Sequence, residues 1–217
     1  FSPATRPDKY YSWNHVTQTW DFVPPATTTM KPGVGYIIRA PDGNAITGPG
    51  TVYNATFEGV PNNGDMLPVP ISGTTMIGEE KWNLLGNPYP SALDAFKFFD
   101  DNIGVLDGTF YLWTHNSTPR STYPGMYAYN YNKDDYASFN KTGPSYYAAT
   151  NPGSDVGYIP NLSVPDRYIT AGQSFMIKGI ADGDVTFKNR QRTTGNNINF
   201  YKPTLYDSST SVTDEEE

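Results

Sequence analysis

The sequence predicts an all-β protein built from two related β-sandwich-like units, with one short helix at about residues 91–102 between them. Aromatic residues make up 15% of the 217-residue chain and charged residues 17%, while glycine and proline number 20 and 19. This composition is typical of many short strands joined by tight turns. Short stretches also recur, in the same order, on both sides of residues 82–102. That central stretch carries the one substantial helical pattern of the chain.

The helical stretch is WNLLGNPYPSALDAFKFFDDN, residues 82–102. A buried strand is expected to open it, and two prolines then hold the chain extended, because a residue before proline is pushed out of the helical region. Ser91 is predicted as the N-cap, with Asp94 reaching back in a variant of the capping box. The apolar face would consist of Leu93, Phe96 and Phe99, and the face toward water of Lys97, Asp100 and Asp101.

The recurring stretches predict an internal duplication. YSWNH at 11–15 is echoed by YLWTH at 111–115, and PGVGYIIRA at 32–40 by AGQSFMIKG at 171–179. Each copy closes on a similar strand, ATF at 55–57 and VTF at 185–187. Three matches in one order favour a repeat more than any one of them does. The predicted division is a first β unit over 1–80, truncated at its N-terminus, a second β unit over 81–203 with a Tyr- and Asn-rich insertion at 116–165, and an acidic disordered linker over 204–217.

Charge and composition exclude several classes of function. The formal net charge is −7, so no basic patch is available to neutralise phosphates, and a nucleic-acid partner is not expected. The chain has no cysteine, which rules out a disulfide framework and thiol chemistry. No stretch has the pattern of a signal peptide or a transmembrane span, so membrane insertion is not expected either. Self-association is left open.

The strongest binding signal is the set of tyrosines in the insertion, which alternate with Asn, Asp, Lys and Ser. Flat rings beside short polar side chains suit sugar recognition, because the rings stack on apolar sugar faces while the polar groups take the hydroxyls. The alternative is that these rings fill cross-strand pairs and the core. A hairpin of residues 126–131 against 136–139 is predicted here. The predicted ligand-binding residues are Trp113, Tyr123, Tyr127, Tyr129, Tyr131 and Tyr136.

Two acidic runs are candidate metal ligands. They offer the hard oxygen atoms that calcium prefers, although a solvated turn is the favoured explanation, because acidic and amide residues in turns usually stabilise the turn itself. The candidate calcium ligands are Asp100, Asp101, Asp134 and Asp135. The two histidines, His15 and His115, each follow a strand tryptophan and are expected to be structural or exposed. We find no nucleophile elbow, zinc motif or phosphate loop, and no pair of carboxyl groups stands out as catalytic, so an enzyme is not predicted.

Several pieces together resemble a known kind of segment: GNPYPSA, GTFYLWTHN, DDYASFNKTG, ITAGQSFMIKG and the acidic tail. They resemble the segment that precedes the C-terminal type IX secretion sorting domain in very large Bacteroidetes cell-surface proteins, over roughly residues 1–205. The present sequence stops at Glu217 without such a sorting domain. The resemblance implies an exported, outer-surface protein with no established activity. The expected function is adhesion or binding of a glycan or surface protein; the alternatives are a structural spacer and an accessory part of a polysaccharide-degrading enzyme.

Overall fold

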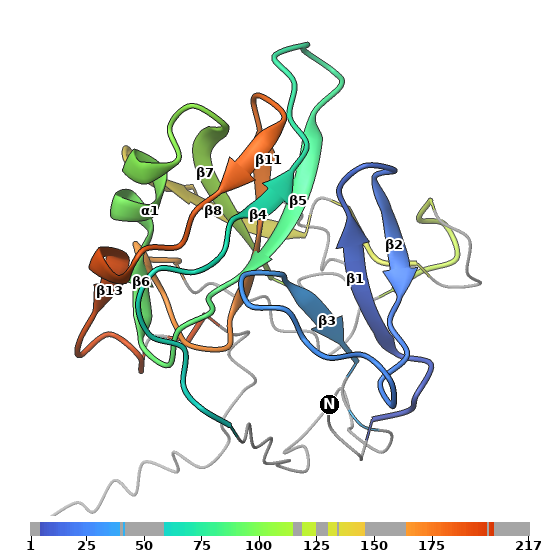
Figure 1. Ribbon diagram of the computed structural model, residues 1–217. Coiled ribbons are helices and arrows are strands. Elements are labelled where there is room, and N and C mark those ends of the chain that lie inside the picture. Colours follow the sequence, from blue (N-terminus) through green and yellow to red (C-terminus); the bar gives the residue numbers. More distant parts are fainter. Residues whose placement is uncertain are drawn as a thin grey trace, which may run out of the picture.

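The computed structural model describes residues 5–39, 41, 59–114, 119–124, 130–133, 135–145, 164–198 and 200–201. Over these ranges the chain forms thirteen strands, one α-helix and one 3-10 helix (Figure 1). The prediction of an all-β protein with one short helix is therefore confirmed. Within the same ranges, no helix has the length and apolar character needed to cross a bilayer.

The largest sheet has five antiparallel strands in the order β5-β11-β7-β8-β9. One of its faces is apolar and forms the main core, with Leu85, Phe110, Phe175 and Ile177 all at most 1% exposed. The helix α1 adds Phe98 to this core, where the ring stacks on Phe187 and meets Phe175 edge-on. The strands of this sheet are β5 (Lys81–Gly86), β7 (Leu106–Trp113), β8 (Tyr136–Asn140), β9 (Gly143–Ser145) and β11 (Ser174–Gly179), and the helix is α1 (Ala95–Asp101).

Two smaller sheets contribute to the same core, which gives the molecule its sandwich-like build. Val69, Leu93, Ile169 and Val185 from these sheets join one cluster with the side chains of the large sheet. The first small sheet has the order β10-β6-β13 and the second pairs β12 with β4. Their bounds are β4 (Val69–Ile71), β6 (Ala92–Asp94), β10 (Tyr168–Ile169), β12 (Gly183–Val185) and β13 (Arg192–Thr193), and the 3-10 helix η1 (Asn189–Gln191) precedes β13.

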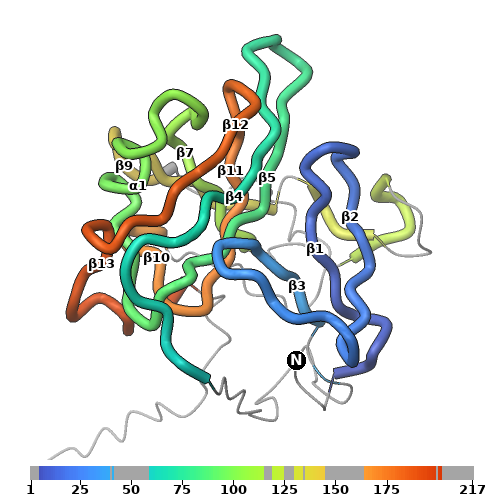
Figure 2. Tube along the Cα trace, viewed as in Figure 1, coloured from blue at the N-terminus to red at the C-terminus, as the bar shows by residue number. Residues whose placement is uncertain are grey.

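The N-terminal residues form a separate three-stranded sheet, β2-β1-β3, made of β1 (Tyr10–Asn14), β2 (Thr19–Phe22) and β3 (Tyr36–Ile38). Figure 2 shows this part of the chain, in blue, as a lobe beside β5. The two sheets meet where the backbone before β3 bonds to β5: Gly35 N–H donates to Leu84 C=O at 3.1 Å, and Gly86 N–H donates to Gly33 C=O at 3.0 Å. The chain from 33 to 38 thus connects both sheets.

A side-chain amide covers a further part of the β5 edge. Gln18, which has a φ of 58°, accepts a hydrogen bond from Trp82 N–H at 2.7 Å and donates one to Trp82 C=O at 3.1 Å. The indole Nε1 of Trp13 donates to the same carbonyl at 2.7 Å. An open strand edge is a template for unwanted pairing, so these contacts both attach the β1–β2 hairpin and protect the edge.

The two sequence copies have the same strand arrangement, β2-β1-β3 in the first and β8-β7-β11 in the second. Their registers also correspond, because Tyr11 pairs with Ile37 in the first copy and Tyr111 pairs with Met176 in the second. The turns before β3 and β11 match as well: Gly33 and Gly172 have φ values of 80° and 73°. A positive φ is a conformation that glycine adopts readily. The repeated sequence segments therefore correspond to repeated structure.

The predicted helix start is wrong. The N-cap is Asp94, whose carboxylate accepts from Phe96 N–H at 3.1 Å, and the helix begins at Ala95. Residues 92–94, downstream of Ser91, form β6 and pair with both β10 and β13. Strand pairing outweighs the local capping signal of Ser91. Asp101 does not face water either, since its side chain is only 2% exposed.

The predicted hairpin of 126–131 against 136–139 is also wrong. Strand β8 pairs with β7 on one side, and from Ser138 onward with β9 on the other. Residues 125–129 lie outside the described ranges, as does the predicted linker at 204–217. The boundary predicted at residue 80 stays a prediction, and the pairing of β4 with β12 crosses it.

A candidate aromatic binding face

The large sheet has an aromatic face on the side away from its core. Because side chains alternate along a strand, burial of Phe110 and Leu112 directs Tyr111 and Trp113 to the opposite side. Trp113 is 37% exposed and Tyr131 is 48% exposed, and their rings meet edge-on with centroids 4.9 Å apart. We call Trp82, Tyr111, Trp113, Tyr131 and Tyr136 the β7 platform.

A lysine lies among the rings at one end of the β7 platform. Trp82 and Tyr111 meet edge-on with centroids 4.9 Å apart, and Lys178 Nζ is 4.9 Å from the Trp82 centroid and 5.9 Å from that of Tyr111. Such a cation over aromatic rings is attracted by their π-electrons. Glu80 Oε1 lies 4.0 Å from the same ammonium. This end of the platform therefore combines flat apolar rings with charged groups that can bond to hydroxyls.

Two phenols of the β7 platform, those of Tyr111 and Tyr136, have raised pKa values and are neutral at physiological pH. Burial, together with the charges of Asp107 and Glu80, raises the pKa of Tyr111 to about 12. Burial and the neighbouring Asp135 raise the pKa of Tyr136 to about 12 as well. A neutral phenol is both a donor and an acceptor, so both tyrosines can act as hydrogen-bond donors.

The structure brings together three of the six predicted ligand-binding residues. Trp113 pairs across the strands with Tyr136 and contacts Tyr131. Tyr123 is half-buried in a turn, where its carbonyl accepts from Asn130 Nδ2 at 3.1 Å. The other two, Tyr127 and Tyr129, lie outside the described residues.

Sequence reasoning missed Trp82, Tyr111 and Lys178 as members of this face. Strand alternation could have identified Tyr111, since it stands two residues before Trp113 on the same strand. Trp82 and Lys178 belong to β5 and β11, and their pairing becomes apparent only from the sheet register. Neighbours that come from distant strands carry no local sequence signal.

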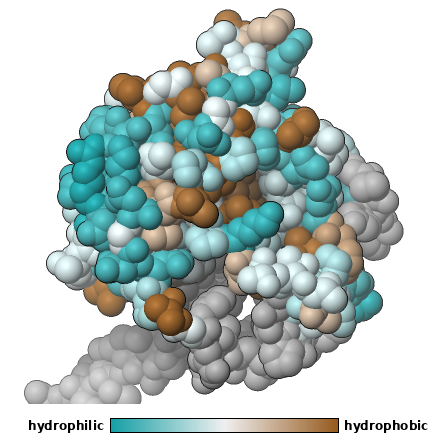
Figure 3. Space-filling model, viewed as in Figure 1, coloured by the Kyte–Doolittle hydropathy of each residue, from teal (hydrophilic) through white to brown (hydrophobic). Residues whose placement is uncertain are grey.

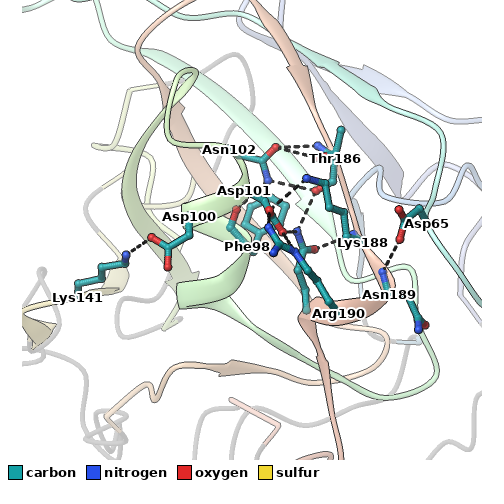
Figure 4. A network of polar contacts seen from close by, with 11 residues as sticks. Asp65, Phe98, Asp100, Asp101, Asn102, Lys141, Thr186, Lys188, Asn189 and Arg190 are labelled. Carbon is teal, nitrogen blue, oxygen red and sulfur yellow. Dashed lines mark hydrogen bonds and ion pairs between the residues drawn. The ribbon is translucent and has the colours of Figure 1, made fainter.

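Two of the candidate calcium ligands are paired with cations of the protein itself. Asp101 is buried and bonds to Lys188 Nζ at 3.1 Å, Gln191 Nε2 at 2.8 Å and the guanidinium of Arg190 (Figure 4). Asp100 points away from this network toward Lys141, with which it forms an ion pair. Figure 3 shows hydrophilic side chains gathered on this side of the molecule, over α1. The two neighbouring carboxylates thus serve different ion pairs.

The other acidic run gives no clearer site. Asp135 is buried and its carboxylate accepts from Thr114 Oγ1 at 3.2 Å, while Asp134 lies outside the described residues. Among the residues that the structure describes, no three His, Cys, Asp or Glu side chains converge as a metal site would require. Calcium binding stays a prediction.

His15 has a structural contact, as expected from its position. Its Nδ1 lies 3.0 Å from Ser72 Oγ, and Ser72 is bonded through its backbone to the Asn83 side-chain amide. His15 thereby joins the β1–β2 turn to the segment after β4. His115 lies outside the described residues.

Comparison with known proteins identifies a family. Residues 1–216 match the family described as "Domain of unknown function (DUF8693)". The chain belongs to this family. No curated protein and no solved structure matches it. The DUF8693 description names no activity, so the functional argument depends on the residues described above.

Proposed function

We propose that this chain is a non-catalytic module of an exported, outer-surface protein and that it binds glycan through the β7 platform. The observation that carries the proposal is the exposure of Trp113 and Tyr131 as an edge-on pair on the sheet face opposite the core. Export to the outer surface is proposed from the resemblance of the GNPYPSA and AGQSF pieces to segments of such proteins. We propose binding without catalysis because the β7 platform consists mainly of aromatic rings, which hold a sugar by stacking.

The chemistry of the β7 platform suits a sugar. Exposed indole and phenol rings stack on the apolar C–H faces of a pyranose, which an acyclic polar ligand does not present. Lys178 and Glu80, beside the Trp82 ring, supply a donor and an acceptor for sugar hydroxyls. Trp113 stands on β7, the central strand of the five-stranded sheet whose other face packs on the core, and this backing favours a ring position set before binding.

Variants of the exposed pair test the proposal. We expect Trp113→Ala and Tyr131→Ala each to weaken glycan binding about tenfold or more, since buried aromatic contacts dominate binding at interfaces. The measurement is a glycan array followed by isothermal titration with the sugars that bind. Phe200→Ala is the matched control, because Phe200 is equally exposed, at 48%, and lies outside the platform.

Two outcomes would contradict the proposal. One is an array on which the unmodified chain binds no glycan, and the other is binding that both platform variants leave intact. The first outcome leaves the structural-spacer hypothesis as the better description of the chain, and the second shows that glycan binds elsewhere than at Trp113 and Tyr131.

A further inference from the structure

The first sequence copy carries a second aromatic platform in the same register as the first. Tyr11 and Trp13 on β1 correspond to Tyr111 and Trp113 on β7, and Trp20 is the cross-strand partner of Trp13, as Tyr136 is of Trp113. We call Tyr11, Trp13, Trp20 and Phe22 the β1 platform. Tyr11 and Trp13 belong to the first copy of the repeat in the sequence.

Each platform has an edge-on ring pair that includes its strand tryptophan; the partner of Trp13 is Trp20 on β2, and the partner of Trp113 is Tyr131, which lies outside the strands. Trp13 meets Trp20 edge-on at a centroid distance of 5.0 Å, and Trp113 meets Tyr131 edge-on at 4.9 Å. In each copy the residue before the tyrosine is buried, Tyr10 at 1% and Phe110 at 0% exposure, so the tyrosine and the tryptophan lie on the other side of the strand in both. Trp20 and Phe22 are 40% and 51% exposed, comparable with the values on the β7 platform.

Direct hydrogen bonds fix the two platforms relative to each other. Trp13 of the β1 platform donates from Nε1 to the backbone carbonyl of Trp82, a member of the β7 platform. The Gln18 amide, in the turn between β1 and β2, binds both backbone groups of Trp82. The spacing between the platforms is therefore a property of the fold and not of a flexible linker.

We propose that the two platforms are two subsites for one uncharged polysaccharide, which the chain binds bivalently. This inference rests on the proposed function and adds the class of ligand. Two aromatic subsites at a fixed spacing suit a ligand whose own structure repeats. We take the ligand to be uncharged because the Lys178–Glu80 pair beside the β7 platform is balanced and the four side chains of the β1 platform carry no charge, so neither subsite offers a net positive charge to a polyanion.

Bivalent binding predicts different behaviour toward polymers and short oligomers. A polymer that occupies both subsites gains from the high effective concentration at the second one, and an oligosaccharide too short to span them does not. The probes are soluble arabinoxylan, mixed-linkage β-glucan and galactomannan, each with its own short oligosaccharides. Isothermal titration gives stoichiometry with the oligosaccharides, and affinity gel electrophoresis gives the strength of polymer binding.

For the polysaccharide that binds, we expect two oligosaccharides per chain in the unmodified protein and one in Trp20→Ala. Polymer affinity should fall about tenfold or more in Trp20→Ala, through loss of the second subsite. Phe22→Ala provides an independent variant of the same platform, and Phe200→Ala is again the control. Circular dichroism establishes that each variant is folded before its binding is interpreted.

The outcomes separate the two proposals. A stoichiometry of one in the unmodified chain, with Trp20→Ala and Phe22→Ala binding polymer normally and Trp113→Ala losing it, overturns bivalence and leaves the proposed function standing. Failure of every polysaccharide and oligosaccharide to bind the unmodified chain overturns both.

Discussion

Asp100 and Asp101 are neighbours in the sequence with opposite surroundings. The Asp101 side chain is 2% exposed and that of Asp100 is 58% exposed, although each pairs with a cation. When a buried carboxylate loses its charge, the cationic and amide groups that donate to it are left with poor hydrogen bonds. When an exposed carboxylate loses its charge, water takes its place as the acceptor. The two positions therefore differ in what their charge contributes to stability.

We expect Asp101→Asn to lower the free energy of unfolding by about 1–3 kcal/mol, because the donors of Lys188, Arg190 and Gln191 lose the negative charge and one of the two acceptor oxygens that they share. Asp100→Asn, with the same chemical change, should cost less than about 1 kcal/mol. Urea denaturation with an unchanged m-value measures both. Equal effects for the two variants would show that burial of Asp101 is unimportant.

Capping at α1 shows why single residues were predicted less well than patterns. Ser91 and Asp94 are both good N-cap residues, and the sequence alone does not say which one follows the last extended residue. The choice is made by β6, whose partners β10 and β13 come from residues 168–169 and 192–193. Asp101 was misplaced for the same reason, since Lys188 and Arg190 are distant in the sequence.

The junction between the sheets depends on a close backbone approach at Gly35. A Cβ atom there would lie 2.5 Å from Leu84 Cγ and 2.7 Å from the Leu85 carbonyl oxygen. Both distances are shorter than real Cβ contacts allow, and the second involves backbone that cannot rotate away. The absence of a side chain at this position lets the lobe of β1, β2 and β3 join β5.

We expect Gly35→Ala to destabilise the protein by about 1–3 kcal/mol or more, as overpacking does in well-packed sites. Gly104→Ala is the matched control, because a Cβ there meets nothing within 4 Å, and it should be neutral or slightly stabilising. Thermal unfolding by circular dichroism compares the two. If Gly35→Ala has the same melting temperature as the unmodified chain, the close backbone approach at Gly35 is not required for stability.

Strand pairing was predictable where the sequence repeats and not where it is unique. The match of 32–40 with 171–179 correctly aligned β3 with β11, and both strands pair with the copy of the YxW strand. The insertion has no second copy to compare with. Residues 136–139 were therefore paired with the nearest upstream segment, residues 126–131. Its strand β8 pairs instead with β7, across residues 114–135.

Three tyrosines in different parts of the fold make the stability of the protein depend on pH in the alkaline range. Burial is the main cause that raises the pKa values of Tyr89, Tyr111 and Tyr136 to about 12 each. In the unfolded chain a tyrosine ionises near pH 10. Below pH 10 these phenols are protonated in both states, and above it the unfolded chain alone releases their protons, which favours unfolding.

The free energy of unfolding should therefore fall as the pH rises from about 10 to 12. Urea denaturation at a series of pH values measures the decline, and absorbance near 295 nm should show tyrosines that titrate above the normal range. Tyr111→Phe should make the decline shallower by removing one of the three groups. A free energy that stays constant through this interval would contradict the assignment of raised pKa values.

The pairing of β4 with β12 limits how the chain can be divided. β4 lies before residue 81, yet Val69 pairs with Val185, and both are buried in the main core. A fragment that begins at residue 81 would leave one side of β12 without its partner and uncover Val185 and Phe187. A fragment that begins near residue 59 would retain that strand, so any fragment that keeps β12 paired has to start upstream of residue 69.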